Sequence, residues 1–484
     1  MSNFQATHHH TALKSAAIES DLDHFIRKLQ QAGAPESSII TFSDFYRGFR
    51  VGKRGLIPES AITPLPPHEI RYLKDLLEYH HSGEKALPHT VVIKLNGGLG
   101  TTMGCSGPKS MIPVKNGLNF LDITIRQLSE YSKEKELIPP LVLMNSFNTE
   151  NQTSEALQKY LGQIDPHPKT FLQNRFPRID SETLLPVSWP KATHREWNPA
   201  GHGDIFSALY SSGILEELLN QNYRYAFISN IDNLGASIDT ALLGYMASEN
   251  LQFLMEVTGR TSMDWKGGHI ARTSSGCLIL RESVQCPEDD LRYFQDIYRH
   301  RFFNTNNLWI DIAALDSILN RSGGTIQLPM LCNRKFLDSA DPDSPVVYQL
   351  ESAMGSALSS FPKSDAICVP RSRFIPVKSC NDLFLLRSDF YILDEKFKII
   401  TDTGSVRTTP QVVLDSRYFG TVDQLNTRFA HGVPSLRNCR KVTVEGDVFF
   451  GKDVTISGDV TISNYGRQPF LIGDNSEIIS NLQI

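Results

Sequence analysis

Short apolar runs alternate with helical stretches between about residue 88 and residue 395. The runs "TVVIKL", "PLVLMNS", "YAFISNID" and "QFLMEVTG" are continuously apolar, which is typical of strands that are covered on both faces. Between them, "FLDITIRQLSEYSKE" and "GDIFSALYSSGILEELL" have apolar positions at helical spacing. This alternation predicts an α/β domain with a largely parallel sheet, in which ligands bind beyond the carboxyl ends of the strands.

Residues 1–87 have a helical pattern throughout. The stretch "ALKSAAIESDLDHFIRKLQQAG" repeats apolar positions every three and four residues and ends at Gly33. The stretch "PLPPHEIRYLKDLLEYHHSG" has prolines at its start and Gly83 just past its expected end. We therefore expect an N-terminal helical segment over residues 1–87, with the α/β domain following over 88–395.

Residues 396–484 are expected to hold a linker and a different kind of module. Near the end of the chain, apolar residues fall on a count of six: Val442, Val448, Val454, Val460, Ile472, Ile478 and Ile484. A hexapeptide period with glycine–aspartate corners predicts a left-handed parallel β-helix, and a twisted antiparallel sheet is the alternative. We expect such a module to support self-association rather than catalysis.

The composition restricts the partners and the compartment. The 484 residues include 48 Lys and Arg against 53 Asp and Glu, so the formal net charge of -5 argues against a general binder of nucleic acid or anionic membranes. Seven cysteines without a CxxC pair indicate a reducing compartment. No signal peptide and no run of membrane-spanning length is visible, so we expect a cytoplasmic protein.

The glycine-rich stretch "KLNGGLGTTMGCSGPKS", residues 94–110, follows the first apolar run. It is not a Walker P-loop, because Pro108 separates Gly107 from Lys109. It is not a dinucleotide fingerprint either, because Met103 stands where the third glycine is required. The remaining interpretation is a different nucleotide loop, whose bare backbone approaches a base and phosphates while Lys109 supplies a positive charge.

This stretch closely resembles the signature loop of the eukaryotic-type UTP–glucose-1-phosphate uridylyltransferases, or UDP-glucose pyrophosphorylases. The resemblance continues through "QNRFPRI", "AGHGDI", "SNIDNLGA", "EVTGRTSMDWKGGHI", "FNTNNLWI" and "VPRSRFIPVKSCNDLFLL". It implies a Rossmann-like, GT-A-like nucleotidyltransferase domain with a mixed, mainly parallel sheet. It also implies a reaction in which α-D-glucose 1-phosphate attacks the α-phosphorus of UTP in line, giving UDP-glucose and pyrophosphate with the assistance of Mg²⁺.

The resemblance carries over roles for individual residues. It makes Lys378 in "FIPVKS" the catalytic lysine at the reacting phosphate and Lys109 a second catalytic lysine at the triphosphate. It makes Asp232 in "NIDN" the ligand of Mg²⁺, directly or through the triphosphate, although an acidic residue after a strand can also be a turn or cap residue. The other nucleotide-binding residues that it implies are Leu95, Asn96, Gly97, Gly98, Gln173, Gly201 and Asn230.

The second substrate is assigned in the same way. The resemblance implies that the sugar phosphate is bound by Gly97, Gly98, His202, Gly268, Glu282, Asn304 and Asn306. His202 is as suitable for donating a hydrogen bond to phosphate as for acting as a general base, and the "NTNN" block could alternatively be a turn at a strand end.

Other functions remain as alternatives at this stage. A uridylyltransferase for galactose 1-phosphate would have the same loop, whereas N-acetylglucosamine 1-phosphate enzymes usually carry an arginine that "GTTMG" lacks. A catalytically idle binding protein is disfavoured, because Lys109, Lys378 and Asp232 are all present. An NAD-dependent oxidoreductase is disfavoured by the incomplete fingerprint.

Overall fold

The fold is described from a computed structural model, which covers residues 2–135, 137–261, 264–338, 341, 343–402 and 408–484. Ser262 and Met263 of the motif "EVTGRTSMDWKGGHI" lie outside the described residues. The chain forms two compact units that alternate along the sequence. The first consists of Met1–Ile93, Phe171–Ile228 and Asp239–Val369, and the second of Lys94–Thr170, Ser229–Ile238 and Pro370–Ile484. The expected regions 1–87, 88–395 and 396–484 are consecutive instead, and their boundaries stay a prediction.

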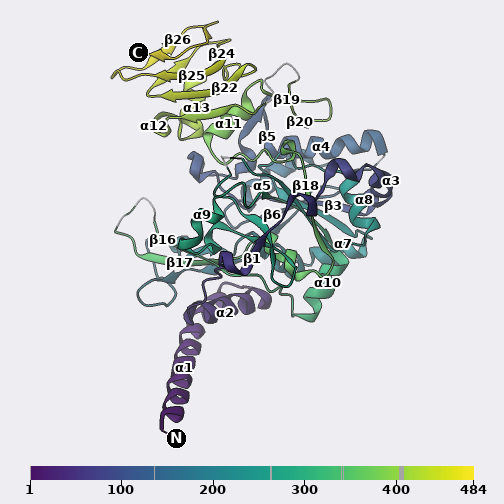
Figure 1. The fold of residues 1–484 in the computed structure, drawn as a ribbon, viewed down its shortest axis with the longest axis vertical. Helices are drawn as coiled ribbons and strands as arrows, with labels where there is room; N and C mark the ends of the chain where they lie inside the picture. The colour runs from purple at the N-terminus through teal and green to yellow at the C-terminus, as the bar shows by residue number, and fades with distance from the viewer. Residues whose placement is uncertain (1, 136, 262–263, 339–340, 342, 403–407) are drawn as a thin grey trace. The chain divides into compact units, whose positions relative to one another are not determined.

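The first unit is built on a mixed sheet (Figure 1). Its strands follow one another in the order β2 (Arg71–Tyr72), β18 (Ser364–Cys368), β12 (Phe253–Gly259), β15 (Phe302–Asp311) and β11 (Tyr225–Asn230), with β3 (Thr90–Leu95) next. The strands β2, β18 and β12 run parallel, whereas β15 runs antiparallel to both of its neighbours. The predicted mixed α/β sheet is confirmed, and its apolar runs are the buried strands.

Shorter strands complete the first unit. β13 (His269–Thr273) pairs antiparallel with β1 (Ile62–Pro64), with β14 (Leu278–Arg281) and with the start of β15. Two further small sheets join β16 (Leu331–Phe336), β17 (Val346–Glu351) and β9 (Ile179–Asp180), and β8 (Arg175–Pro177) with β10 (Trp197–Pro199).

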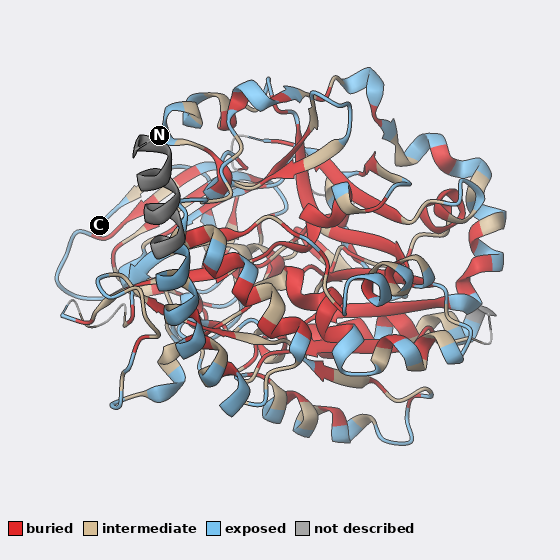
Figure 2. Cartoon of the chain, turned by 90° about the horizontal axis from the view of Figure 1, so that it is seen from below, coloured by how far each residue is buried: buried red, intermediate tan, exposed pale blue. Residues whose placement is uncertain are grey.

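Most strand residues are buried (Figure 2), whereas the helices of the first unit carry both buried and exposed residues. They are α1 (Ser2–Gln31), α2 (Glu36–Arg50), α3 (His80–Ala86), α6 (Ile205–Ser211), α7 (Ile214–Asn220), α8 (Thr240–Ser248), α9 (Leu291–Phe294) and α10 (Ile312–Arg321). The expected helix end at Gly33 is confirmed, because this residue follows α1 with a positive φ of 70°. Phe25, Phe42 and Phe176 form an aromatic core between α1, α2 and β8.

Two predicted helices differ in the structure. The stretch before Gly83 is largely the 3₁₀ segment Leu73–Tyr79, and Gly83 lies inside α3 instead of ending it. A Cβ on Gly83 would lie 1.7 Å from the carbonyl oxygen of Thr240, so this glycine allows α3 to pack closely on α8. The expected helix at residues 203–219 is divided into α6 and α7 at Gly213, whose φ is 76°.

The second unit begins with the last two residues of β3, which lie beside β6 (Leu141–Asn145). The backbone N–H of Asn96 donates to the carbonyl oxygen of Met144 over 2.8 Å. The helices of this unit before its C-terminal part are α4 (Phe120–Lys135), α5 (Glu150–Leu157) and α11 (Cys380–Arg387). Its strands are the hairpin of β4 (Pro113–Lys115) and β5 (Leu118–Asn119), the pair β19 (Tyr391–Leu393) and β20 (Ile399–Thr401), and the first two residues of β7 (Lys169–Leu172). The predicted helix at residues 120–134 is confirmed as α4.

The C-terminal part of the second unit consists of short strands that pair in parallel. The first of these strands, β21 (Gln411–Leu414), precedes the helices α12 (Ser416–Phe419) and α13 (Val422–Arg428). The strands after these helices are β22 (Cys439–Glu445), β23 (Val448–Phe450), β24 (Thr455–Ile456), β25 (Gly458–Ser463), β26 (Phe470–Ile472), β27 (Glu477–Ile478) and β28 (Leu482–Gln483). Val442 pairs with Val460, three hexapeptides further along, and Ile456 pairs with Ile478. The pairings of these strands among the described residues are parallel, so the antiparallel alternative is wrong.

The hexapeptide period marks the interior of these coils. Six of the seven periodic residues are buried, and only Ile484, at 37% exposure, is accessible.

Among the described residues, each helix is too short or too polar to span a membrane.

Candidate active site

The glycine-rich stretch after β3 forms a closed loop in the second unit. Gly100 donates its N–H to the carbonyl oxygen of Gly107 over 3.3 Å, and Lys109 donates its N–H to that of Gly98 over 3.1 Å. The backbone therefore returns on itself and brings Lys109 beside Gly98. A Cβ on Gly98 would meet no atom within 4 Å, so the packing of the chain itself does not demand a glycine there.

The residues before Gly98 hold the loop in place. Asn96 is buried, and its Nδ2 donates to Oδ1 of Asn145 over 2.7 Å and to Oγ1 of Thr153 over 2.9 Å. The carbonyl oxygen of Gly97 accepts from Oγ of Ser146 over 2.8 Å. Leu95 is also buried, and its carbonyl accepts from the N–H of residue 231. The side chain of Asn96 and the carbonyl group of Leu95 thus fix the turn, and the backbone at residues 97 and 98 is what a ligand can approach.

Lys109 and Asp232 form an ion pair. Nζ of Lys109 lies 2.5 Å from Oδ2 of Asp232, and the two side chains are only 14% and 15% exposed. Oδ1 of Asp232 is buried and has no hydrogen-bond partner in the described part of the chain. A buried carboxylate oxygen without a partner suits a hard cation such as Mg²⁺. Where the structure is described, no three His, Cys, Asp or Glu side chains gather as a metal site.

Lys378 stands at the entrance of α11 in the same unit. The N–H of Val377 donates to the carbonyl oxygen of Asp232 over 3.3 Å, and Oγ1 of Thr102 donates to the carbonyl of Lys378 over the same distance. The N–H of Lys378 donates to Oδ2 of Asp382, which together with Ser379 forms the capping box of the helix. The structure therefore brings the Lys378 segment, Asp232 and the glycine loop together, and the Lys378 side chain is exposed.

Lys94 belongs to this assembly and was not predicted as a functional residue. It is 3% exposed, and its Nζ donates to Oγ of Ser229 over 2.7 Å and to the carbonyl oxygen of Ala236 over 2.8 Å. These contacts connect the ends of the loop that carries Asn230 and Asp232. The available signal was a lysine inside an otherwise apolar strand, because a buried charge needs partners.

Gln173 and Gly201 meet in the first unit. Nε2 of Gln173 donates to the carbonyl oxygen of Gly201 over 2.6 Å. Gly201 has a φ of 87°, and a Cβ there would lie 2.3 Å from the carbonyl oxygen of Ser352, so only glycine fits. The neighbouring Asp204 accepts from the N–H of Asn174 over 2.6 Å and from its Nδ2 over 3.0 Å. Burial raises the pKa of Asp204 to about 6.

His202 is held in one tautomer. Its Nδ1 accepts a hydrogen bond of 3.1 Å from the backbone N–H of Met354. Burial lowers the pKa of His202 to about 4, so the ring is neutral at physiological pH. A neutral ring that accepts at Nδ1 carries its proton at Nε2, and this atom can donate to a phosphate.

Gly268, Glu282, Asn304 and Asn306 come together around a bulge in β15. The pairing of β12 with β15 shifts register between Glu256 and its successor, and Asn306 adopts a positive φ of 58°. Asn304 and Asn306 exchange two hydrogen bonds, and the N–H of Asn304 donates to the carbonyl of Gly268 over 3.0 Å. A Cβ on Gly268 would lie 2.6 Å from Oε2 of Glu282, so this carboxylate lies directly against the glycine.

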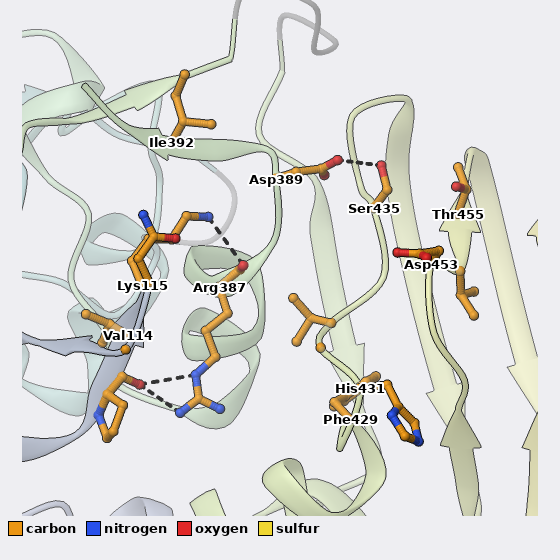
Figure 3. Close-up of a pocket in the computed structure, with 16 residues that line it drawn as sticks. Val114, Lys115, Arg387, Asp389, Ile392, Phe429, His431, Ser435, Asp453 and Thr455 are labelled. Carbon is orange, nitrogen blue, oxygen red and sulfur yellow. Dashed lines mark hydrogen bonds between the residues drawn. The ribbon is translucent and has the colours of Figure 1, made fainter. Parts of the chain in front are cut away.

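A separate cavity of about 730 Å³ in the second unit is lined by none of these residues (Figure 3). Three charged side chains of its lining, Lys115, Arg387 and Asp389, are hydrogen bonded to residues of the same unit. Nζ of Lys115 donates to three carbonyl oxygens at the end of α11, and burial lowers the pKa of Lys115 to about 8. Arg387 donates to the carbonyl of Pro113, and Asp389 accepts from Oγ of Ser435 over 2.7 Å. We do not regard this cavity as the active site.

A buried strand that opens into a glycine-rich turn, beside a lysine and a carboxylate with a free oxygen, defines a nucleotide-dependent transferase. The sequence model of the UTP–glucose-1-phosphate uridylyltransferases matches residues 41–457, and the chain belongs to this family of nucleotidyltransferases.

Curated relatives and solved structures support this membership. The chain is similar to the UTP–glucose-1-phosphate uridylyltransferases of Encephalitozoon cuniculi, at 40% identity over 86% of this chain and 82% of that protein, and of Saccharomyces cerevisiae, at 36% over 93% and 88%. A solved UDP-glucose pyrophosphorylase mutant from Leishmania major in complex with UDP-glucose matches with a TM-score of 0.88 and 40% identity, over 96% of this chain and 99% of that one. The UDP-glucose phosphorylase of Trypanosoma brucei matches with a TM-score of 0.87 and 40% identity, over 96% and 100%.

Proposed function

We propose that this chain transfers the uridylyl group of UTP to α-D-glucose 1-phosphate, giving UDP-glucose and pyrophosphate. An oxygen of the sugar phosphate forms the new bond to the α-phosphorus, and the bond to the β-phosphate bridge breaks in line. The observation that carries the proposal is the Lys109–Asp232 pair beside the open face of Gly98, in a chain of this family.

The nucleotide is bound by the loop and by Gln173. The backbone at Gly97 and Gly98 approaches the nucleotide and sugar phosphate where no side chain intervenes. Gln173 reads uracil beside Gly201, because its amide carries both a donor and an acceptor. Lys109 exchanges Asp232 for the triphosphate, and Lys378 lies at the reacting phosphate. Two unit charges of the same sign about 4 Å apart repel by roughly 4 kcal/mol at an effective dielectric near 20, and the two lysines offset this repulsion between the substrates.

Mg²⁺ is proposed as the cofactor. The buried and unpartnered Oδ1 of Asp232 supports this proposal, with oxygens of the triphosphate as the other ligands. When bound, the ion neutralises part of the charge of the triphosphate and of the leaving pyrophosphate.

The sugar phosphate is bound by residues of the first unit. His202 donates from Nε2 to the phosphate, and no general base is needed because the phosphate arrives ionised. Glu282, Asn304 and Asn306 bind the hydroxyl groups of the hexose beside Gly268. A site built to pair with each hydroxyl rejects analogues that lack one.

The finer features of the molecule are proposals as well. The parallel coils and their hexapeptide period support a left-handed β-helix at the C-terminus, through which copies of the chain associate. The seven cysteines are all free, which supports a cytoplasmic location.

The test is pyrophosphate release from UTP and Mg²⁺ with glucose 1-phosphate, galactose 1-phosphate or N-acetylglucosamine 1-phosphate, beside a Lys378→Ala variant. Turnover with glucose 1-phosphate, lost in the variant, is the expected result. Preference for another sugar would overturn the substrate, and absence of turnover in folded protein that binds UTP would overturn the enzymatic function.

A further inference from the structure

Two segments of the second unit, residues 229–238 and 370–378, are hydrogen bonded along their length. Asn233 makes the central contacts with its side chain. Its Oδ1 accepts from the N–H of Ile375 over 2.8 Å, and its Nδ2 donates to the carbonyl oxygen of Arg373 over 3.1 Å. One residue earlier, the carbonyl of Asp232 accepts from the N–H of Val377. The loop that carries the proposed metal ligand therefore orders the segment that leads to Lys378.

The two segments pack closely against each other, and their contact is buried at Asn233. Asn233 is 1% exposed and forms an isolated antiparallel bridge with Pro376. A Cβ on Gly235 would lie 2.4 Å from the carbonyl oxygen of Ser372, so the two backbones touch where glycine stands. Nη2 of Arg373 adds a hydrogen bond of 2.8 Å to the carbonyl oxygen of Ser237.

The Asn233 loop is itself held from β3. Lys94 connects Ser229 to Ala236 through its Nζ, and the N–H of Ala236 donates to the carbonyl oxygen of Asn233 over 3.1 Å. A continuous series of contacts thus runs from the buried strand through Asn233 to residues 373–377. The side chain of Lys378 is exposed, so its position depends on where this backbone is held.

We propose that Asn233 is a positioning residue that sets Lys378 relative to Lys109 and Asp232. The inference rests on the proposed function, since it assumes that Lys378 acts at the reacting phosphate. Asn233 reaches that lysine only through the main chain of residues 373–377. A displacement of about 1 Å at a reacting group lowers a rate by about 100-fold, which is the scale of the expected effect.

The test is a double-mutant cycle of Asn233→Ala and Lys378→Ala, with single-turnover rates and calorimetric UTP affinity measured for each variant. We expect Asn233→Ala to lower the rate ~10–100-fold and to leave UTP affinity within a factor of about 3. In the Lys378→Ala background, the same substitution should cost nothing further, because the group that it positions is gone. An equal loss in both backgrounds would overturn the inference.

Two controls keep the result interpretable. Asn464, in the C-terminal coils, is also buried and also bonds backbone groups through its amide, so Asn464→Ala should lower the melting temperature and leave the rate unchanged. If Asn233→Ala does not fold, Asn233→Asp keeps the acceptor for Ile375 and loses only the donor, and it enters the same cycle. A Lys378→Ala variant as fast as the native enzyme would overturn the proposed role of Lys378, and absence of turnover in the native protein would overturn the proposed function; both outcomes differ from an additive cycle.

Discussion

Nζ of Lys109 lies 2.5 Å from Oδ2 of Asp232, although one residue follows a glycine loop and the other a strand more than a hundred residues later. The pair keeps two poorly exposed charges compensated. It also leaves Oδ1 of Asp232 unpartnered, so the lysine and the carboxylate are both ready to take new partners.

Replacement of Lys109 tests this relationship. Lys109→Met should lower kcat/KM for UTP by ~10²–10³, because a preorganised charge at the triphosphate is lost. It should also lower the free energy of unfolding by about 1–3 kcal/mol, because Asp232 remains uncompensated. The double variant Lys109→Met with Asp232→Asn should regain stability but not activity, as measured by urea denaturation and steady-state rates. A double variant less stable than the single one would contradict the pairing.

Gly98 offers a test of ligand approach. Gly98→Ala should change the free energy of unfolding by less than about 0.5 kcal/mol, because its Cβ would meet no atom of the described residues within 4 Å. UTP should bind at least about tenfold more weakly, because the methyl group takes the place of a ligand atom. The matched control is Gly83→Ala, whose Cβ would collide with Thr240: it should cost about 1–3 kcal/mol and leave UTP affinity intact. Unchanged UTP affinity in Gly98→Ala would remove Gly98 from the site.

Asp204 predicts a pH dependence of stability. Burial raises its pKa from 3.8 to about 6, so the folded state holds this proton more tightly than the unfolded state. Its contribution to stability is complete below about pH 4 and is lost as the pH rises through about 6, by about 3 kcal/mol. The pKa of His202 is lowered to about 4, which acts in the opposite direction over the same interval. The difference in unfolding free energy between native protein and Asp204→Asn therefore isolates the effect, and a difference that does not change with pH would refute it.

The pH dependence of kcat/KM distinguishes two roles of His202, a hydrogen-bond donor to phosphate and a general base. Because its pKa lies near 4, the ring is neutral from about pH 6 to pH 9, and kcat/KM for the sugar phosphate should show no inflection from this residue. His202→Gln should lower kcat/KM by ~10–100-fold with the shape of the profile unchanged, since only a donor to phosphate is lost. An inflection that is present in the native enzyme and absent in the variant would show that His202 acts as a general base.

Several parts of the site were predictable from local pattern. The strand β3, the loop after it and the charge of Lys109 follow from an apolar run, a glycine spacing and a lysine at the end of the loop. The resemblance added Asp232, Lys378 and the hexose residues. The pattern misjudged Gly83, which lies inside a helix and allows it to pack closely on α8.

The roles of Lys94, Asp204 and Asn233 could not be read from the sequence, because each depends on partners that packing brings near. Lys94 looks like one polar residue in a strand until Ser229 and Ala236 are placed at its Nζ. The tautomer of His202 likewise depends on the backbone of Met354.

The buried strands, the glycine-rich loop and the six-residue period of the C-terminal coils can be predicted from the sequence. Each of these follows from side-chain periodicity or backbone freedom within a few neighbouring residues. Three features are visible only in the folded chain: the ion pair of Asp232 with Lys109, the hydrogen bonds of Asn233 to the segment before Lys378, and the bulge in β15 that brings the asparagines together. These contacts join residues that are distant along the chain, and their register is set by the packing of whole elements, which no local pattern encodes.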